Sequence, residues 1–510
     1  MTTSTESTEL ITEKKDLYPY QKEDLEAIFD RIHNKPPNYH LLYQLPTGGG
    51  KTVIFCEIAR RYIEIFQKKV LILTHRVELC KQTSKMMQTF GVKNKVITSN
   101  VKALPRTNEY SCYVAMVETL KNRIFDENIF LDDIGIVIVD EAHFNSFRKL
   151  FSSFKNSFLL GVTATPLSSN NKLPMNENYQ ELLVGHPIPF LVNHGYLARA
   201  QTITYDVGLS SLKIGINGDY TVKSSDDLYS NIEMQDKLVH AYQTHTLNKK
   251  TLIFNSGIRS SIQVRDTFQK LGFPIKHLDN THPDEERKAI LKWFKKTPNA
   301  ILTSVSILTT GFDEPSVESI ILNRATKSLT LYFQMIGRGS RRIEGKDSFT
   351  IIDLGNNALR FGFWTDPINW SDIFKNPDMY LNNIQDDTTI EKFFRYKMPP
   401  EIRELFANTK DISFDIEEAY RKAVFANLRP KIALEASMDQ HAKMCVENAD
   451  NIKVAKYLAH LLREDIECRI RLYTDCLSQC SKNYAVWLVE DYQQKLLALI
   501  AKKFRELSWD

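Results

Sequence analysis

Residues 39–52 read YHLLYQLPTGGGKT, and the fold of the surrounding chain can be inferred from this stretch. The apolar run 39–44 predicts a buried β-strand, and the pattern of 52–66 predicts an amphipathic helix after the glycines. Glycines between a strand and a helix allow backbone N–H groups to surround a phosphate, and the helix N-terminus adds its dipole. We therefore predict a phosphate-binding loop made of Thr47, Gly48, Gly49, Gly50, Lys51 and Thr52.

Two side chains of this loop have separate predicted roles. Lys51 is expected to reach the β- and γ-phosphates of a nucleotide, and Thr52 is expected to ligate Mg²⁺. A plain glycine-rich turn is the alternative. The strand before the loop, the helix after it and a matching downstream motif argue against that alternative.

Short apolar runs separated by amphipathic stretches recur through the first 360 or so residues. The runs are continuous and not alternating, which is typical of parallel strands buried between two layers of helices. The predicted strands are 39–44, 70–74, 95–98, 112–116, 134–139 and 158–162, and then 251–255, 275–278, 300–303, 319–322 and 349–353. The two groups of strands predict two α/β lobes.

The character of the chain changes outside these lobes. The first 15 residues are rich in Thr, Ser and Glu and lack the apolar core of a signal peptide, and the sequence after Glu401 reads as helices. We predict a disordered tail at 1–16, a first lobe at 17–166, a connector at 167–230, a second lobe at 231–358 and a mostly helical extension at 359–510.

Bulk composition is that of a soluble globular protein of several domains. The chain has 510 residues, of which 43% are hydrophobic and 25% charged, and it has no apolar run near the ~20 residues of a membrane span. Seven scattered cysteines without a framework spacing favour reduced thiols. We expect a cytoplasmic protein, associated with the nucleoid or nuclear, with no membrane partner. The net charge of +4 neither requires nor excludes nucleic acid.

A second motif follows the predicted strand 134–139. This strand leads into Asp140 and Glu141, with Ala142 and His143 next. Ligands of open α/β sheets bind at the carboxyl ends of the strands, so both carboxylates are expected at such an edge. We predict that Asp140 holds Mg²⁺ and that Glu141 polarises the attacking water. An isolated Asp-Glu pair is usually a surface pair, but the strand and the upstream phosphate loop favour a site.

Tyr20 and Gln21 precede the phosphate loop by about 25 residues. An aromatic ring can stack on adenine, and a glutamine amide can pair with the adenine edge. We therefore predict that these two residues contact the base, although packing is the usual role of such a tyrosine.

Glutamine and arginine residues are concentrated in the stretch QMIGRGSR at 334–341. On a helix predicted to begin near Leu329, the spacing of Gln334, Arg338 and Arg341 places one amide and two guanidiniums on one face. Arginine against a γ-phosphate can be worth ~10³–10⁵ in rate. Upstream, Gly311 permits a tight turn, and Asp313 is a candidate to contact the ribose or orient the arginines.

These motifs, in this order over residues 18–342, resemble the core of the superfamily 2 DEAD/DEAH-type helicases. The resemblance implies two RecA-like parallel-sheet lobes with ATP and Mg²⁺ between them, followed here by an α-helical extension. It implies that Lys51, Asp140, Glu141, Gln334, Arg338 and Arg341 serve hydrolysis. It also implies that His143, Thr163 and Thr165 couple the water-activating motif to the second lobe and to nucleic acid.

Stretches 74–79, 163–166, 311–315 and 334–341 look like the DNA-directed RadD, UvsW and XPB-like group. They differ from the motifs of RNA-dedicated DEAD-box proteins. The chain departs from many RadD-type proteins in lacking a C-terminal cysteine cluster. The candidate nucleic-acid contacts at predicted strand ends are His75, Arg76, Ser99, Asn100, Thr119 and Arg259.

The resemblance therefore predicts an ATP-dependent helicase or translocase that unwinds or remodels branched or duplex DNA. An RNA helicase and an ATP-gated nucleic-acid-binding subunit of a larger repair or defence complex are the alternatives. The helical extension carries apolar residues at helical spacing that must pack on the motor, on each other or on a protein partner. These are Val454, Leu458, Leu461 and Leu462, followed by Trp487, Leu488, Tyr492, Leu496, Leu497 and Ile500.

Overall fold

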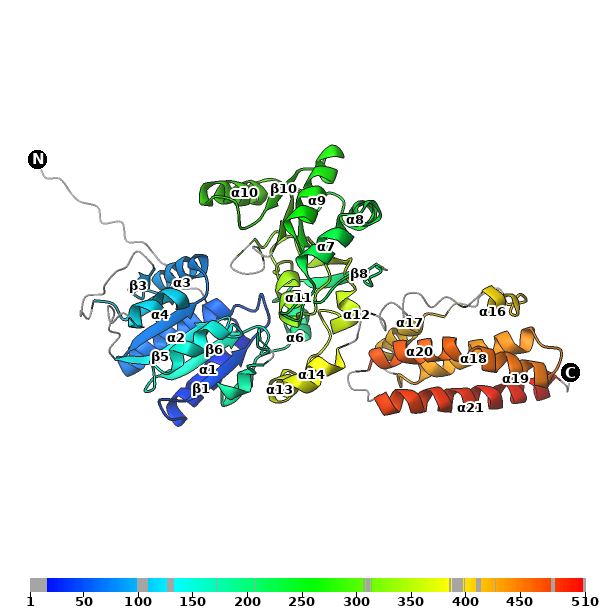
Figure 1. The fold of residues 1–510 in the computed structure, drawn as a ribbon. Coiled ribbons are helices and arrows are strands. Elements are labelled where there is room, and N and C mark those ends of the chain that lie inside the picture. The colour runs from blue at the N-terminus through cyan, green and yellow to red at the C-terminus, as the bar shows by residue number, and fades with distance from the viewer. Residues whose placement is uncertain are drawn as a thin grey trace, which may run out of the picture. The chain divides into compact units, whose positions relative to one another are not determined.

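The computed structural model describes most of the chain. The described residues are 16–98, 109–125, 133–170, 172–205, 207–305, 308, 312, 314–384, 387, 398, 400–409, 414–426, 428–477 and 482–507. The chain forms two compact units, Met1–Asp387 and Thr388–Asp510. The first unit contains two β-sheets, and the described part of the second unit is helical (Figure 1).

The first sheet has seven strands in the order β3-β4-β2-β5-β6-β1-β7, and every neighbouring pair is parallel. The strands are β1 His40–Gln44, β2 Lys69–Thr74, β3 Asn94–Ile97, β4 Cys112–Met116, β5 Ile134–Asp140, β6 Phe158–Thr163 and β7 Glu181–Val184. Because all pairs are parallel, the carboxyl ends of β1 and β5 lie at one edge, separated only by β6. This topology brings the phosphate loop and the carboxylate pair together.

Helices cover both faces of this sheet. They are α1 Pro19–Asn34, α2 Lys51–Phe66, α3 Val77–Thr89, α4 Val117–Phe125 and α5 Arg148–Phe151, with 3₁₀ turns at Asn145–Phe147 and Met175–Glu177. The short helix α6 Ile188–Asn193 follows β7. Successive side chains of β1 pack in opposite directions: Leu41 and Tyr43 join one core cluster and Leu42 joins the other. The uninterrupted apolar run of β1 is thus a consequence of burial on two faces.

The second sheet has six parallel strands in the order β10-β11-β9-β12-β13-β8. Its strands are β8 Arg199–Thr204, β9 Thr251–Asn255, β10 Ile275–Leu278, β11 Ile301–Val305, β12 Ser319–Asn323 and β13 Ser348–Asp353. Its helices include α7 Val222–Tyr229, α8 Ile232–His245, α9 Ile258–Lys270, α10 Asp284–Lys296 and α11 Leu329–Ile336. The fold class is therefore the expected one, two parallel-sheet lobes and a helical C-terminal part.

The predicted connector 167–230 supplies an edge strand to each sheet. β7 pairs with β1 in the first sheet, and β8 pairs with β13 in the second. Both strands were missed because none of their residues is buried: β7 has only four residues, and β8 lacks a continuous apolar run. The boundaries of the connector and of the tail at 1–16 stay predictions.

The first unit extends beyond the predicted end of the second lobe at residue 358. The short helices α12 Asn357–Phe361, α13 Trp370–Lys375 and α14 Pro377–Asn383 follow β13. Trp364 and Trp370 are buried in the main core of the first unit. The aromatic residues that distinguish this stretch therefore belong to the first unit, and the separate helical unit begins at Thr388.

The second unit is a helical bundle with its own core. Its helices are α16 Pro400–Glu404, α17 Ile416–Phe425, α18 Ile432–Glu447, α19 Ile452–Leu461, α20 Arg463–Asp475 and α21 Lys482–Leu507. Leu458, Leu488 and Tyr492 are buried in this core, whereas Val454 and Trp487 are largely exposed. Among the described residues, no helix has both the length and the apolar character that crossing a bilayer requires.

Candidate functional site

The phosphate loop joins β1 to α2 in a conformation that needs glycine. Gly48 and Gly50 have φ of +90° and +85°, in the left-handed region that L-residues disfavour. A Cβ atom at Gly50 would lie 2.5 Å from Gln21 Nε2, so a side chain there would also clash. Lys51 Nζ donates a hydrogen bond to the carbonyl of Leu45 at 3.3 Å. The loop is therefore compact, with its lysine folded over its own backbone.

The carboxylate pair lies at the end of β5, all seven residues of which are buried. Glu141 has φ of +52°, a conformation that costs a non-glycine residue about 1–3 kcal/mol. The Glu141 N–H donates to Asp140 Oδ1 at 3.0 Å. The chain therefore reverses sharply directly after the strand, at the residue predicted to orient water.

Burial and charge act against each other in this cluster. Burial lowers the pKa of Lys51, and the neighbouring charges of Glu141 and Asp140 partly restore it. Burial and the charge of Glu141 raise the pKa of Asp140. Burial also acts to raise the pKa of Glu141, but the positive charge of Lys51 and of other neighbours outweighs burial and lowers it. Lys51 thus holds Glu141 ionised while Asp140 gains a proton most easily.

Arg338 and Arg341 of the second lobe act on the same cluster. Both guanidiniums lower the pKa of Lys51, after burial, and Arg338 lowers the pKa of Glu141 as a lesser contribution than Lys51. The structure therefore brings the predicted lysine, carboxylates and arginines within electrostatic range of one another. The sequence separation of Lys51 and Arg341 shows that the fold and not the chain makes this cluster.

The helical-face interpretation of 334–341 is wrong. α11 ends at Ile336, and Gly337 is its C-terminal capping residue. The N–H groups of Arg338 and Gly339 then bond three residues back, which tightens the chain into turns. Arg341 forms an isolated antiparallel bridge with Leu197. Of the three residues, Gln334 alone lies on the helix.

Gly337 and Ser340 pack directly on the phosphate loop. Ser340 Oγ donates to the carbonyl of Thr47 at 3.4 Å. A Cβ atom at Gly337 would lie 2.4 Å from Thr47 Cγ2, and a Cβ atom at Gly48 would lie 2.7 Å from Ser340 Oγ. Close approach of the two segments thus explains why glycine is present on both sides.

A chain of side chains joins the carboxylates to α11. His143 Nδ1 lies 3.4 Å from Glu141 Oε2 and 3.1 Å from Thr163 Oγ1. Thr163 Oγ1 donates to the carbonyl of Thr165 at 2.9 Å. Thr165 Oγ1 then donates to Thr330 Oγ1, also at 2.9 Å. Because Thr330 is in α11, the three predicted coupling residues are physically linked to the helix that carries Gln334.

Several buried polar atoms around the cluster make no hydrogen bond within the described part of the chain. They are Glu141 Oε2, Gln334 Nε2 and both ring nitrogens of His75. A buried polar atom without a partner costs about 1–3 kcal/mol and needs an explanation. Polar atoms of this kind, beside a lysine and two carboxylates, fit a site for a charged ligand.

The predicted adenine contacts bind the phosphate loop itself. Tyr20 OH donates to the carbonyl of Gly49 at 2.7 Å, and Gln21 Nε2 donates to the same oxygen at 3.3 Å. Gln21 Oε1 accepts from the Tyr18 N–H at 3.0 Å. The ring of Tyr196 lies 4.8 Å, centroid to centroid, from the rings of both Tyr18 and Tyr20. Their role in base binding stays a prediction.

The candidate nucleic-acid contacts have different surroundings. The His75 ring lies 4.1 Å from the Phe144 ring, and burial lowers the pKa of His75 to about 4. Thr119 in α4 is buried, and Arg76 is half-buried before α3. Arg259 in α9 is exposed and pairs with Asp227 at 3.2 Å. Ser99, Asn100, Gly311 and Asp313 lie outside the described residues.

Sequence reasoning missed the contacts between lobes. Arg287 in α10 lies 3.2 Å from Glu78 in α3, a pair of residues 209 positions apart. Thr330 and Ser340 likewise meet partners in the first lobe. No local pattern marks such residues, because each is an ordinary polar residue until the fold supplies its partner.

Two family models and several known proteins match parts of this chain. Residues 14–168 match the family described as type III restriction enzyme, res subunit, and residues 231–342 match the helicase conserved C-terminal domain. A 51.5 kDa protein of Lactococcus phage (isolate 7-9) is 28% identical over 338 residues, which are 66% of this chain and 70% of the phage protein. IRC3 of Saccharomyces cerevisiae, named as an ATP-dependent helicase, is 28% identical over 367 residues, 66% of this chain and 51% of IRC3.

A solved structure shows the same fold. A fragment assigned as the HsdR subunit of a type I restriction enzyme from Vibrio vulnificus YJ016 superimposes with a TM-score of 0.54 and 21% identity. The match covers 68% of this chain and 65% of the fragment. Taken with the two matched families, these likenesses place the chain in the superfamily 2 helicases, a class of ATP-hydrolysing enzymes. The chain spans about half the length of IRC3.

Proposed function

We propose that this helicase hydrolyses ATP between its two lobes to translocate on or remodel duplex or branched DNA. The observation that carries the proposal is the cluster of Lys51, Asp140 and Glu141 within electrostatic range of Arg338 and Arg341. Enzymes of this mechanism need charges that surround the transferred phosphoryl group from two sides.

The residues present fit a nucleotide with Mg²⁺. The glycine backbone and Lys51 would hold the phosphates, and Thr52 with Asp140 would hold the metal ion, which supplies charge neutralisation at the phosphates when bound. Glu141, ionised beside Lys51, would orient and deprotonate water through Oε2, the atom without a hydrogen bond. Gln334 and the two arginines would complete the site from the second lobe.

The threonine chain provides a route for coupling. Any shift of Glu141 during turnover reaches Thr330 through His143, Thr163 and Thr165, which are in hydrogen-bond or ion-pair contact. Movement of α11 relative to the first lobe would then accompany hydrolysis. DNA bound across both lobes would experience that movement as translocation.

Two features support DNA over RNA as the substrate. The first-lobe match is to a family of restriction-enzyme subunits, and the motif sequences resemble a DNA-directed group. Among the predicted strand contacts, Arg259 is exposed and Arg76 partly so, as contacts to a phosphate backbone require. The ring nitrogens of His75 and the residue Thr119 are buried, and we assign His75 to support of the site and Thr119 to support of α4.

The test is the ATPase rate of the full chain with single-stranded, duplex and forked DNA and with RNA of equal length. We expect DNA, and forked DNA most of all, to stimulate hydrolysis. Lys51→Ala serves as the control for contaminating ATPases. Stimulation by RNA equal to that by DNA would contradict the assignment of substrate.

The C-terminal unit is proposed to act in substrate choice through a partner, either protein or DNA. Its exposed side chains include Tyr457, Val486 and Trp487, exposed by 60%, 66% and 51%. Replacement of Val486 and Trp487 by serine should leave basal ATPase activity within about 2-fold. The preference for forked over single-stranded DNA should fall, and an unchanged preference would contradict this role.

A further inference from the structure

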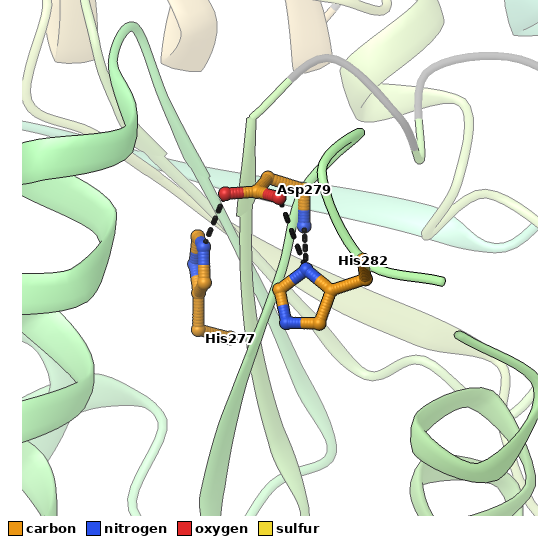
Figure 2. A group of neighbouring side chains, drawn as sticks. All are labelled: His277, Asp279 and His282. Atoms are coloured by element: carbon orange, nitrogen blue, oxygen red, sulfur yellow. Dashed lines mark hydrogen bonds and ion pairs between the residues drawn. The ribbon is translucent and has the colours of Figure 1, made fainter. Parts of the chain in front are cut away.

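Two histidines and an aspartate converge at the carboxyl end of β10, an edge strand of the second sheet (Figure 2). His277 is in β10, and Asp279 and His282 are in the segment that leads to α10. One nitrogen or oxygen atom from each of the three side chains lies within 4.8 Å of the others. The side chains of His277 and Asp279 are each 3% exposed and that of His282 is 17% exposed.

The two carboxylate oxygens of Asp279 have different neighbours. Oδ1 accepts from the N–H and the hydroxyl of Thr281, at 2.8 and 2.7 Å, and lies 3.0 Å from His282 Nδ1. Oδ2 lies 2.9 Å from His277 Nε2. Thr281 therefore holds the carboxylate through Oδ1 and leaves Oδ2 facing His277. A carboxylate that binds a cation through one oxygen is arranged in this way.

His277 is held in place by a further shell of polar groups. Its Nδ1 lies 2.8 Å from Ser261 Oγ, and Ser261 Oγ lies 2.9 Å from Thr303 Oγ1. Asn255 Nδ2 donates to Thr303 Oγ1 at 2.8 Å. Metal-binding histidines almost always have such a partner on the second ring nitrogen, because it fixes the ring orientation and the tautomer.

The donor set selects the class of cation. Two imidazole nitrogens and one carboxylate oxygen are typical ligands of Zn²⁺, whereas Mg²⁺ prefers oxygen ligands alone. Three protein ligands leave a coordination position for water. The partial exposure of His282 gives solvent and cation a route to ligands that are otherwise buried.

We propose that His277 Nε2, Asp279 Oδ2 and His282 Nδ1 bind a divalent transition-metal ion of the Zn²⁺ class. The residues differ from those assigned to Mg²⁺ and ATP. In the bound state each ligating nitrogen needs its lone pair, so His282 Nδ1 gives up the hydrogen bond that it accepts from the Asp279 N–H at 3.3 Å. The ring proton of His277 is on Nδ1 and donates to Ser261 Oγ. The ring proton of His282 is on Nε2, and each histidine keeps one proton.

A cation at this position would link β10 to the segment before α10. α10 carries Arg287, which pairs with Glu78 of the first lobe at 3.2 Å. The ion would therefore fix the start of a helix that contacts the other lobe. This role does not depend on the assignment of the ATP site, so the two proposals fail separately.

The test is calorimetric titration of the full, chelator-treated chain with ZnCl₂ in the presence of excess Mg²⁺. We expect about one Zn²⁺ per chain, with His282→Asn weakening binding by about 100-fold or more, as loss of a direct ligand requires. Ser261→Ala should weaken it by about 10-fold. His240→Asn is the matched control, because His240 is exposed in α8 and outside the cluster, and it should bind as the wild type does.

Absorption spectra of the Co²⁺-bound protein distinguish this site from a site formed by cysteine thiols. Co²⁺ bound by His277, Asp279 and His282 should show d–d bands without the thiolate charge-transfer band that binding at Cys468 or Cys476 would produce. His282→Asn is chosen because His282 is at the loop, and unchanged ATPase activity would show that the variant is folded. Equal Zn²⁺ affinity of His282→Asn and wild type, or no Zn²⁺ binding by the wild type, would overturn the proposal.

Discussion

The first lobe and the C-terminal bundle each bury a charged cluster, and the two clusters differ in how far their atoms are satisfied. In the bundle, His441 Nε2 lies 2.7 Å from Asp465 Oδ2 and its Nδ1 lies 2.9 Å from Tyr492 OH. Arg469 Nε lies 2.6 Å from Asp465 Oδ2, and Arg469 also donates to Ser437. The charged groups and hydroxyls of this cluster are therefore paired with one another.

In the cluster around Lys51, by contrast, some buried polar atoms lack a hydrogen bond. Glu141 Oε2 and Gln334 Nε2 are buried and make no hydrogen bond within the described ranges. A satisfied buried network contributes to a unique packed structure, whereas an incomplete one costs stability. We infer that the bundle cluster serves folding and that the Lys51 cluster is arranged for a ligand.

Lys51→Ala should give the largest effect of the variants that compare the two clusters, and that effect should be on ATP hydrolysis. Removal of the charge that holds Glu141 ionised and faces the phosphates should lower the ATPase rate by at least about 1000-fold. The free energy of unfolding should fall as well, because Glu141 then lacks the cation that keeps it ionised. Steady-state ATPase assays and denaturant titration measure both. Lys172→Ala, an exposed lysine of the same unit, is the control, and normal turnover by folded Lys51→Ala would refute the loop assignment.

Arg469→Ala in the bundle should lower stability without an effect on hydrolysis. It leaves Asp465 buried without its cation, which should lower the free energy of unfolding of the bundle by about 3–5 kcal/mol. Basal ATPase activity should not change. Amide hydrogen exchange in α18 and α20 reports the local stability. Arg421→Ala, an exposed residue of α17, should have almost no effect, and equal effects of the two variants would remove the distinction between the clusters.

A pH dependence should follow from His441. Burial lowers its pKa to about 4, below the ordinary value of about 6.5, so the unfolded bundle binds the proton more strongly. Stability is therefore complete above about pH 6.5 and falls toward about pH 4, by up to about 1.4 kcal/mol per pH unit. Hydrogen exchange in the bundle across this range measures the slope. His441→Gln should abolish it, and a slope that survives would show that another group is responsible.

Arg259 lies outside both clusters, and Arg259→Ala should have a smaller effect than the three variants above. Arg259 is exposed and its ion pair with Asp227 is at the surface, so loss of one phosphate contact should weaken DNA binding only a few-fold. The slope of log affinity against log salt should fall by about one unit. Arg265→Ala, in the same helix α9, is the control. An unchanged salt slope for Arg259→Ala would exclude a phosphate contact.

The fold was predictable because its strands are continuous apolar runs. The structure has β1, β5 and β9 within one residue of the predicted segments. The edge strands β7 and β8 were missed, since their half-exposed patterns resemble loops. The assignment of the lobes as RecA-like and the roles of the motifs came from the resemblance to a family, because the apolar pattern alone does not predict them.

The candidate site was predictable only where its chemistry is local. Glycines and Lys51 form one continuous stretch, and the stretch has the expected strand and helix on either side. The path from Thr165 to Thr330 spans 165 residues, so no window of sequence reveals it. The end of α11 at Ile336 was missed because the spacing of Gln334, Arg338 and Arg341 does not show where the helix ends.

Glu141→Gln shows whether the incomplete cluster is the site of ATP hydrolysis. The amide keeps the shape of the side chain and removes the base, so ATP affinity should stay within about 3-fold while single-turnover hydrolysis falls by about 10²–10⁴. Nucleotide binding and single-turnover rates should be measured on the same folded preparation. Hydrolysis at the wild-type rate by Glu141→Gln would contradict the assignment of this cluster to catalysis.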